Sequence, residues 1–426
     1  MKRTLSHIMT LLTLALLLPI AGSCTSGGDE PTPVGKPDIV LSFTLVTGPV
    51  TRSDEQGHPE TDGEYLAFEE GIDLNDTGIF LYGAVSSTDD PRLISGAILD
   101  GTLPKNITLT GSPGNYTLQL TLPKRTLREA LGLEDEDDMP SDLSLRMLIL
   151  SNCTPVDNSF TLSSLTANGY SATIGNLNDW AYNMSDIYDA TSDATAIELL
   201  YGTPKPSAPL FGTITRRVST SALEDSGPLE HLDLGSISLL RAVAKIRVVD
   251  NISAKKNGYP QLTDVTFRGK QESLRVVPAD AGNYVNGSQV HTANIFDPTL
   301  NAVTYSTSFR LGEMPDKWNM TPASLRTGKT FVAYVPEQAI HSADTASGPV
   351  PALHITVDFG PDKEGNDDIR SYTVPMSRYG NTPFEFGDYI LRNHIYTLAV
   401  TGISNGEMAV KARVVPWLTE RDHTDL

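Results

Sequence analysis

The stretch Ile39–Val46, IVLSFTLV, decides the fold class because apolar residues fill every second position along it. In an extended chain, successive side chains point to opposite faces, so Ile39, Leu41, Phe43 and Leu45 share one face. This alternation predicts a β-strand that packs one face against a core and leaves the other face toward solvent.

The same period of two recurs along the rest of the chain. It is found in YTLQLTL from Tyr116 to Leu122, in LHITVDF from Leu353 to Phe359 and in MAVKARV from Met408 to Val414. Turn-rich sequences such as NGYP and PDKEGNDD lie between such segments, and the chain contains 34 Gly and 28 Pro. Many short strands with frequent turns are typical of antiparallel sandwiches and barrels, so we expect an all-β fold.

Helices are expected to be scarce. The segment Thr126–Asp138, TLREALGLEDEDD, predicts a short helix with Thr126 as its N-cap, and Ser192–Tyr201 is a weaker candidate. The acidic run Glu134–Asp138 predicts a solvated loop rather than a cation site.

Domain organisation follows from length and from a change in composition. After a signal peptide of residues 1–23, about 400 residues remain, enough for two or three domains. The polar segment SALEDSGPLEHLDLG ends at residue 235, and ISLLRAVAKIRVVD then opens a strong strand. We therefore predict two β-sandwich domains in tandem, over residues 53–235 and 236–426.

The N-terminus has the three parts of a secretion signal. Lys2 and Arg3 precede an apolar core, Leu11–Ile20, which is too short for a good membrane span, and the small residues AGS follow. Small residues directly before Cys24 resemble a lipobox, although Ala21 stands where leucine is commoner. This resemblance implies cleavage before Cys24 and lipidation of that residue, palmitate included; the alternative is an ordinary signal peptide with an incidental cysteine.

The segment Thr25–Lys36, TSGGDEPTPVGK, has too few apolar residues to pack. Its glycines, prolines and polar residues predict a flexible or extended spacer. Such a spacer suits a tether between a lipid on Cys24 and the first strand.

Charge and cysteine content limit the possible partners. The chain has 52 acidic and 32 basic residues, a formal net charge of −20, which argues against nucleic acid and against a basic membrane-binding patch. With Cys24 lipidated, Cys153 is the other of the chain's two cysteines. It ends the apolar run LRMLILSNC, so we expect a buried structural thiol and no disulfide in the mature chain.

No enzymatic motif is found in the sequence. The eight histidines show no HxxxH, HxH or HExxH spacing, and there is no Walker motif, no GxGxxG after a strand and no GxSxG elbow. His394, in LRNHIYTLAV, is expected to be a strand residue rather than a base, and Trp180, Trp318 and Trp417 show no ligand-platform spacing. We therefore predict no catalytic residue, metal or cofactor, and favour a binding or structural protein over an enzyme.

Four segments occur in an order that points to one family. The first is the strand IVLSFTLVT (Ile39–Thr47), followed by the loop GPVTRSDEQ with Arg52 and by TGIFLYGAV. The second is LLRAVAKIRVVD (Leu239–Asp250), the third is FVAYVPEQ (Phe331–Gln338), and the fourth is GDYILRNHIYTLAVTGI (Gly387–Ile403) before MAVKARVVPWL. Together they resemble the fimbrillin superfamily of Bacteroidetes, whose members are the building blocks of pili.

The resemblance implies an assembly mechanism. The fold would be two transthyretin-like sandwiches, and the lipidated precursor would reach the outer membrane before joining a fimbrium on the cell surface. An arginine-specific protease would cut between Arg52 and Ser53, releasing residues 24–52 as a propeptide together with the first strand. Removal of the first strand would open a groove in the sandwich, and a strand from a neighbouring subunit would then fill that groove. The resulting fimbrium would serve adhesion and biofilm formation.

The C-terminal end has the character of such a donor strand. Met408, Val410, Ala412 and Val414 share one face, and Trp417 extends the apolar end. The alternative is that both end strands belong to their own domains. The short link SNGE before this strand suits a tip subunit, which need not donate a strand, and Arg52 argues against an anchor subunit, so stalk and tip both stay open with tip favoured.

The expected partners are other fimbrial subunits, a host or bacterial surface ligand and, in the precursor, the outer membrane. One rival is a glycan-binding surface lipoprotein of a nutrient-uptake system, which would keep its lipid and first strand and line a groove with aromatic residues. A second rival, a hydrolase using acidic residues, would need a cleft with convergent carboxylates of unequal pKa.

Overall fold

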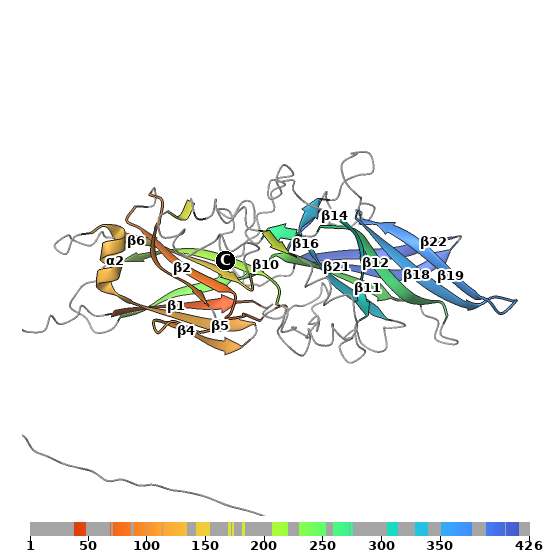
Figure 1. Ribbon diagram of the computed structural model, residues 1–426, viewed down its shortest axis with the longest axis horizontal. Coiled ribbons are helices and arrows are strands. Elements are labelled where there is room, and N and C mark those ends of the chain that lie inside the picture. Colours follow the sequence, from red (N-terminus) through yellow and green to blue (C-terminus); the bar gives the residue numbers. More distant parts are fainter. Residues whose placement is uncertain are drawn as a thin grey trace, which may run out of the picture. The chain divides into compact units, whose positions relative to one another are not determined.

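Strands make up most of the molecule that the structure describes (Figure 1). The computed structural model describes residues 38–47, 69, 71–86, 89–99, 101–112, 114–133, 142–153, 169–171, 173, 181–183, 207–219, 230–252, 259–271, 273–275, 305–313, 329–339, 351–376, 389–404 and 406–416. The predicted all-β fold is confirmed, and each of the four alternating segments lies in a strand.

The first sandwich consists of a four-stranded and a five-stranded sheet (Figure 1). The four-stranded sheet has the order β4-β5-β1-β9, with β1 at Asp38–Val46, β4 at Ile107–Ser112, β5 at Asn115–Pro123 and β9 at Glu230–Ser238. The five-stranded sheet has the order β10-β8-β6-β2-β3, with β2 at Thr77–Ala84, β3 at Arg92–Leu99, β6 at Asp142–Ser151, β8 at Leu210–Ser219 and β10 at Leu240–Arg241.

The second sandwich has the same numbers of strands in its two sheets. One sheet has the order β15-β16-β11-β21-β22, with β11 at Val243–Asp250, β15 at Gly312–Glu313, β16 at Thr330–Pro336, β21 at His394–Ser404 and β22 at Glu407–Pro416. The other has the order β14-β12-β18-β19, with β12 at Gln261–Gln271, β14 at Tyr305–Arg310, β18 at Ala352–Pro361 and β19 at Asp367–Pro375. Two short pairs join β7 (Ala181–Asn183) to β13 (Ser273–Arg275) and β17 (Gln338–Ala339) to β20 (Tyr389–Ile390).

Both sandwiches contain a parallel pair within mostly antiparallel sheets. β1 runs parallel to β9, and β11 runs parallel to β21. Parallel neighbours cannot be joined by a tight turn, so each pair brings together segments that are far apart in the sequence.

The core of the first sandwich is built from the alternating faces of its strands. From β1 it takes Ile39, Leu41, Phe43 and Leu45; from β5, Leu118, Leu120 and Leu122; and from β6, Leu143, Leu145, Met147 and Ile149. The period of two in the sequence therefore matches the buried face, as predicted. The other face of β1 is half-buried at Val40, Thr44 and Val46 rather than fully wetted.

The predicted helix forms, but both of its predicted ends, Thr126 and Asp138, were wrong. α2 spans Lys124–Leu131, with Pro123 at the N-cap and Thr126 inside the helix (Figure 1). Proline suits this end because it has no N–H, and the first N–H groups of a helix have no intrahelical partner. Gly132 ends the helix at φ 73°, a left-handed conformation that glycine adopts without strain. Ser192–Tyr201 and Glu134–Asp138 lie outside the described residues.

The chain passes from the first sandwich to the second a few residues after residue 235, where the sequence analysis placed the domain boundary. That position lies within β9, and the next strand, β10, still pairs with β8 of the first sandwich. The first strand of the second sandwich, β11, starts at Val243, so the sheets divide between Arg241 and Val243.

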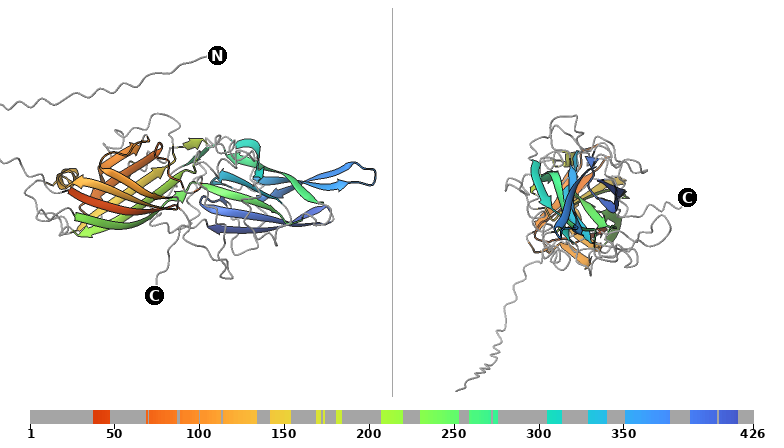
Figure 2. Two further views of the ribbon diagram at one scale, coloured as in Figure 1. Left: turned by 90° about the horizontal axis from the view of Figure 1, so that it is seen from below. Right: turned by 90° about the vertical axis from the view of Figure 1, so that its right-hand side faces the viewer.

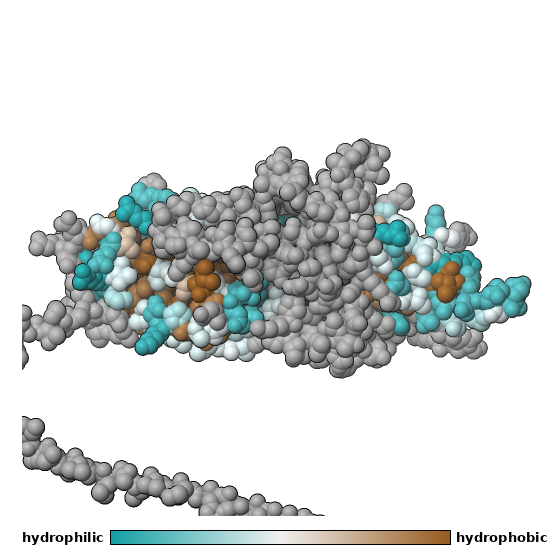
Figure 3. Space-filling model, in the orientation of Figure 1, coloured by the Kyte–Doolittle hydropathy of each residue, from teal (hydrophilic) through white to brown (hydrophobic). Residues whose placement is uncertain are grey.

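The hairpin of β18 and β19 extends beyond the other strands of its sandwich (Figure 2). The residues from Pro361 to Asp367 at its turn are exposed, and the described surface there is hydrophilic (Figure 3). Charged residues such as Asp368 and Arg370 lie on β19, which ends its sheet. Charges on an edge strand discourage pairing with other chains.

Candidate functional site

The first strand lies in a slot between two others. β1 pairs antiparallel with β5, from Asp38 opposite Pro123 to Val46 opposite Asn115, and parallel with β9 on its other side. Both of its backbone edges are therefore in hydrogen-bonded ladders. If β1 were removed, β5 and β9 would each have an unpaired edge facing the same gap.

The apolar face of β1 fills the core beneath this slot. Ile39, Leu41, Phe43 and Leu45 are each between 1% and 3% exposed. Burying one such side chain contributes about 1.5–3 kcal/mol, so a chain without β1 would expose a groove with a strong preference for another apolar strand. These are the four residues that the sequence predicted for the displaced strand, and their strand is part of the first sandwich.

The carboxyl end of β1 is anchored at Thr47. The backbone N–H of Thr47 donates to the carbonyl of Gly114 at 3.2 Å, and its Oγ1 accepts from the N–H of Gly114 at 3.0 Å. Its carbonyl accepts a hydrogen bond of 2.5 Å from Nη2 of Arg241. Thr47 is fully buried, and its N–H, its hydroxyl and its carbonyl each form a hydrogen bond.

Arg241 lies on β10 and is itself 0% exposed. Besides Thr47, its Nε donates to the carbonyl of Glu69 at 2.8 Å, and its Nη1 donates to Oδ1 of Asn393 at 3.4 Å. A buried guanidinium needs such acceptors because its N–H groups have lost water. Arg241 thus joins residue 47 and residue 69, the two ends of the 48–68 segment.

Glu69 is also held by the second sandwich. Its Oε1 accepts from Nζ of Lys245 on β11 at 2.7 Å and from the hydroxyl of Tyr334 on β16 at 2.6 Å. Glu69 is 3% exposed, so this is a buried ion pair reinforced by a hydrogen bond. The predicted cleavage site, Arg52 and Ser53, belongs to the 48–68 segment and lies outside the described residues.

The C-terminal strand ends its sheet. β22 pairs with β21 as an antiparallel hairpin, from Ser404 opposite Glu407 to His394 opposite Pro416. Met408, Val410 and Ala412 are half-buried against the core of the second sandwich, and Val414 lies further along the same strand. Trp417, like the predicted lipidation site Cys24, lies outside the described residues.

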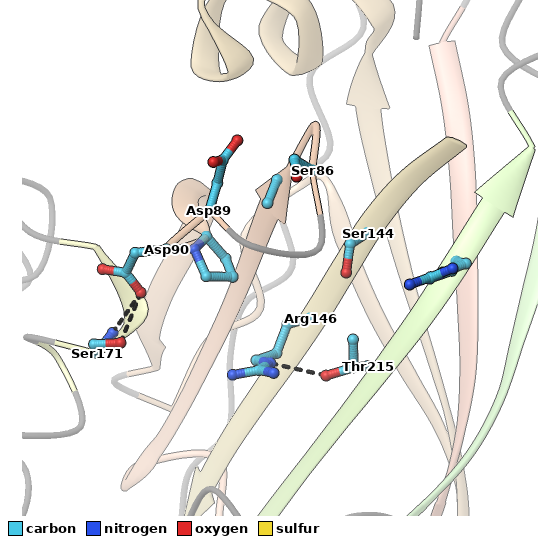
Figure 4. A pocket seen from close by; sticks show the side chains of 10 residues that line it. Ser86, Asp89, Asp90, Ser144, Arg146, Ser171 and Thr215 are labelled. Atoms are coloured by element: carbon cyan, nitrogen blue, oxygen red, sulfur yellow. Dashed lines mark hydrogen bonds between the residues drawn. The ribbon is translucent and has the colours of Figure 1, made fainter. Parts of the chain in front are cut away.

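A polar pocket of about 540 Å³ opens on the outer face of the five-stranded sheet of the first sandwich (Figure 4). Its lining comes from β2, β6, β8 and nearby loops: Ala84, Ser86, Asp89, Asp90, Pro91, Ser144, Arg146, Ser171, Thr215 and Arg217. Arg146 points across the sheet, and its Nε donates to Oγ1 of Thr215 at 2.8 Å. Oδ1 of Asp90 accepts from the N–H and the hydroxyl of Ser171 at 3.0 and 2.8 Å.

The pocket offers donors and acceptors rather than reactive groups. The guanidinium of Arg146 lies 4.3 Å from the ring centroid of Tyr170, which leaves that face of the ring covered. The described lining has serine hydroxyls and carboxylates but no histidine, lysine or cysteine beside them. Such a lining can bind a polar group. The sequence analysis did not predict this pocket. A signal was present, because Ser144 and Arg146 alternate with the core residues Leu143, Leu145 and Met147 and so belong to the opposite face of β6.

Two predicted structural residues are placed as expected. Cys153 is buried, its Sγ donates to the carbonyl of Ser151 at 3.0 Å, and burial raises the pKa of its thiol. His394 begins β21 and is 5% exposed, with Nδ1 at 2.7 Å from the carbonyl of Arg392. Among the residues that the structure describes, no group of three or more His, Cys, Asp or Glu side chains is arranged to hold a metal ion.

Arg241 was missed by sequence analysis. A signal was present, because a single charged residue interrupts the apolar run LLRAVA. Such a residue is either exposed or buried with acceptors, and only the fold shows which.

In the described part of the chain, no helix is long and apolar enough to cross a membrane.

No protein-family model and no curated protein matches this chain. Among solved structures, it is similar to the tip fimbrial protein Mfa3 from Porphyromonas gingivalis with a C-terminal truncation, at 13% identity and a TM-score of 0.43, covering 89% of this chain and 100% of that one. A candidate cell adhesion protein from Parabacteroides distasonis is similar at 12% identity and a TM-score of 0.42, covering 88% and 96% of the two chains.

A candidate polysaccharide-binding protein from Bacteroides thetaiotaomicron is similar at 10% identity and a TM-score of 0.35, covering 89% of this chain and 96% of that one. Fimbrial and candidate adhesion proteins are thus among the structures that this chain resembles.

Proposed function

We propose that this chain is the precursor of an adhesive fimbrial subunit that assembles by exchanging its first strand. In this proposal the chain is exported, lipidated at Cys24, carried to the outer membrane and then cut between Arg52 and Ser53. β1 leaves with the propeptide, and a strand of a neighbouring subunit takes its place. The mature subunit serves cell adhesion and biofilm formation.

The position of β1 is the observation that carries the proposal. β1 is the first strand in the chain that the structure describes, lies between β5 and β9 and fills the core with four side chains. Arg52 lies six residues beyond the last residue of β1 in the sequence, so one cut there separates the strand from the rest of the sandwich. The slot that is left would satisfy the backbone groups and bury the apolar face of an added strand.

The lipid and the long spacer fit the same order of events. Before the cut, the lipid on Cys24 holds the precursor at the membrane through β1, with burial contributing about 0.8 kcal/mol per CH₂ group of the lipid. After the cut, only the β1 contacts connect the lipid to the subunit. Release from the membrane and opening of the slot are then a single event.

A tip position is favoured over a stalk position. β22 stays paired with β21 from Glu407 to Pro416, and its partly buried residues Met408, Val410 and Ala412 pack on their own sandwich. A stalk subunit would have to lift this strand off and insert it elsewhere, whereas a tip subunit would keep it.

The glycan-binding rival is less well supported. A glycan-binding protein would have aromatic side chains along a groove. The described residues that line the polar pocket around Arg146 include no aromatic side chain. The ring of Tyr170 has the guanidinium of Arg146 over it. A polar ligand of a tip subunit could still use this pocket.

The substitution Arg52→Ala tests the proposal in cells. It should leave the chain lipidated at Cys24 and absent from fimbriae, because the strand cannot be released. Lys36→Ala is the matched control, since it removes a basic residue before β1, and it should assemble like the unchanged chain. Normal fimbriae containing Arg52→Ala would contradict the proposal.

A further inference from the structure

The carboxyl end of β1 is bound by Arg241, which lies on β10 and would remain in the subunit if β1 were removed. Arg241 donates to the carbonyl of Thr47 through Nη2 at 2.5 Å and to the carbonyl of Glu69 through Nε at 2.8 Å. In the sequence, Thr47 precedes the proposed cleavage site at residues 52 and 53, and Glu69 follows it. A cut there separates them into two different chains.

The two acceptors differ in what else holds them. Glu69 is bound through its carboxylate by Lys245 at 2.7 Å and by Tyr334 at 2.6 Å, both on the second sandwich. Thr47 is bound by Gly114 and Arg241 at the end of the strand that would leave. Departure of β1 therefore takes away the Thr47 carbonyl and leaves the Glu69 carbonyl in place.

A buried guanidinium that loses an acceptor is destabilised unless another oxygen replaces it. Arg241 is 0% exposed, and its backbone is fixed in β10 by pairing with β8. A strand that refills the slot can supply this oxygen only if a main-chain carbonyl falls at the position of Thr47. That position is two residues beyond Leu45, the last of the four core side chains of β1.

We propose that Arg241 sets the register of the strand that replaces β1, by donating a hydrogen bond to a main-chain carbonyl of that strand at the position of Thr47. The inference rests on the proposed function. Arg241 is a positioning residue: side chains in the slot recognise any strand with the right alternation, and Arg241 selects the register in which the strand end reaches it. A strand shifted by two residues would keep its apolar face inward but fail to place its end at Arg241.

The test uses the full chain with a sequence-specific protease site in place of residues 51–54. After cleavage, two peptides compete with β1 for the slot. Both begin at Lys36 and run through Val46. One ends in Thr47 carboxamide, and the other ends in 1-aminopropan-2-ol, which keeps the N–H and hydroxyl of Thr47 and lacks the terminal carboxamide that carries the carbonyl.

We expect the carboxamide peptide to occupy the slot about tenfold to a hundredfold more tightly, the range for a hydrogen bond to a charged group. Occupancy is measured by native mass spectrometry. In an Arg241→Lys variant, which keeps the charge but not the reach of the guanidinium, the preference should fall to a few-fold.

The outcomes separate the two proposals. Equal occupancy by both peptides in the unchanged chain would overturn the role of Arg241 while strand exchange stands. An undiminished preference in a folded Arg241→Lys chain would overturn it as well. Failure of either peptide to replace β1 would overturn strand exchange together with this inference. If Arg241→Lys does not fold, the peptide pair in the unchanged chain still decides.

Discussion

The side chain of Phe43 is 2% exposed in the core that β1 shares with β5 and β6. Phe43→Ala should destabilise the uncut precursor by about 3–5 kcal/mol, the usual cost of removing a buried aromatic side chain. In the assembled subunit as proposed, β1 has left, so the stability of that form should be unchanged. Thermal unfolding of both forms measures this.

Leu81→Ala is the matched control for Phe43. Leu81 is fully buried in the same core, on β2, which the proposed cut would leave in the subunit. It should destabilise the precursor and the assembled form alike. Equal losses for Phe43→Ala in both forms would mean that β1 never leaves.

Tyr82 is expected to make the stability of the fold sensitive to alkaline pH. Burial raises the pKa of Tyr82 to about 12 and outweighs the opposing effect of the side chain of Thr173 beside its hydroxyl. A folded-state pKa above the unfolded value of about 10 means that stability is intact below pH 10 and lost as the pH rises toward 12. Two pH units correspond to about 2–3 kcal/mol.

The variant Tyr82→Phe should therefore flatten the fall in stability between about pH 10 and 12. At neutral pH it should cost no more than about 0.5–1.5 kcal/mol, the contribution of one neutral hydrogen bond such as that with Thr173. Chemical denaturation at several pH values measures both effects. An unchanged alkaline fall would show that Tyr82 does not titrate as its burial indicates.

Single residues differ in how well they could be predicted. The burial of Leu41 and Phe43 follows from local alternation, and that of Cys153 follows from the apolar run before it. The roles of Arg241 and Arg146 depend on acceptors from other strands. Because these contacts are distant in sequence, no local pattern could supply them.

At the scale of elements, β22 separates tip from stalk. Ala399 on β21 is the register partner of Lys411 on β22. Cysteines at these two positions would lie within the distance that a disulfide spans, since opposed residues in antiparallel strands have Cα atoms about 4.5–5.5 Å apart. The disulfide would lock β22 to its own sandwich.

For a tip subunit, the locked chain Ala399→Cys/Lys411→Cys should join fimbriae as the unchanged chain does. For a stalk subunit, assembly should stop and return on addition of a reductant, so each sample is its own control. Electron microscopy of fimbriae with labelled subunits shows the outcome. Cys153 is buried and should not interfere.

Elements were predictable where their pattern is local. β1, β5, β18 and β22 follow from alternation. Both ends of α2 were misplaced because Pro123 was not considered as its N-cap and Gly132 was not considered as its C-cap. The pairing of β1 with β9 was not predictable, since a parallel partner is chosen by the fold and not by a turn. The same holds for the change of sheet between Arg241 and Val243.

At the scale of the whole molecule, Glu69 couples the two sandwiches. Glu69→Gln removes the carboxylate that Lys245 and Tyr334 face, and it should cost about 3–5 kcal/mol because a buried charge loses its partner. Differential scanning calorimetry should then show separate transitions where the unchanged chain shows one.

Glu129→Gln is the control for Glu69. It breaks the pair of Arg125 and Glu129, whose side chains are 71% and 60% exposed. Such a surface pair contributes about 0.5 kcal/mol at most, so this variant should unfold like the unchanged chain. A matching result for Glu69→Gln would mean that the buried ion pair does not hold the sandwiches together.

The most direct test of strand exchange is the N-terminal sequence of the protein taken from the cell surface. We predict that it begins at Ser53, with β1 and the lipid removed. A chain blocked at Cys24 that still contains Ile39–Thr47 would contradict strand exchange, and a permanent surface lipoprotein would then describe it better.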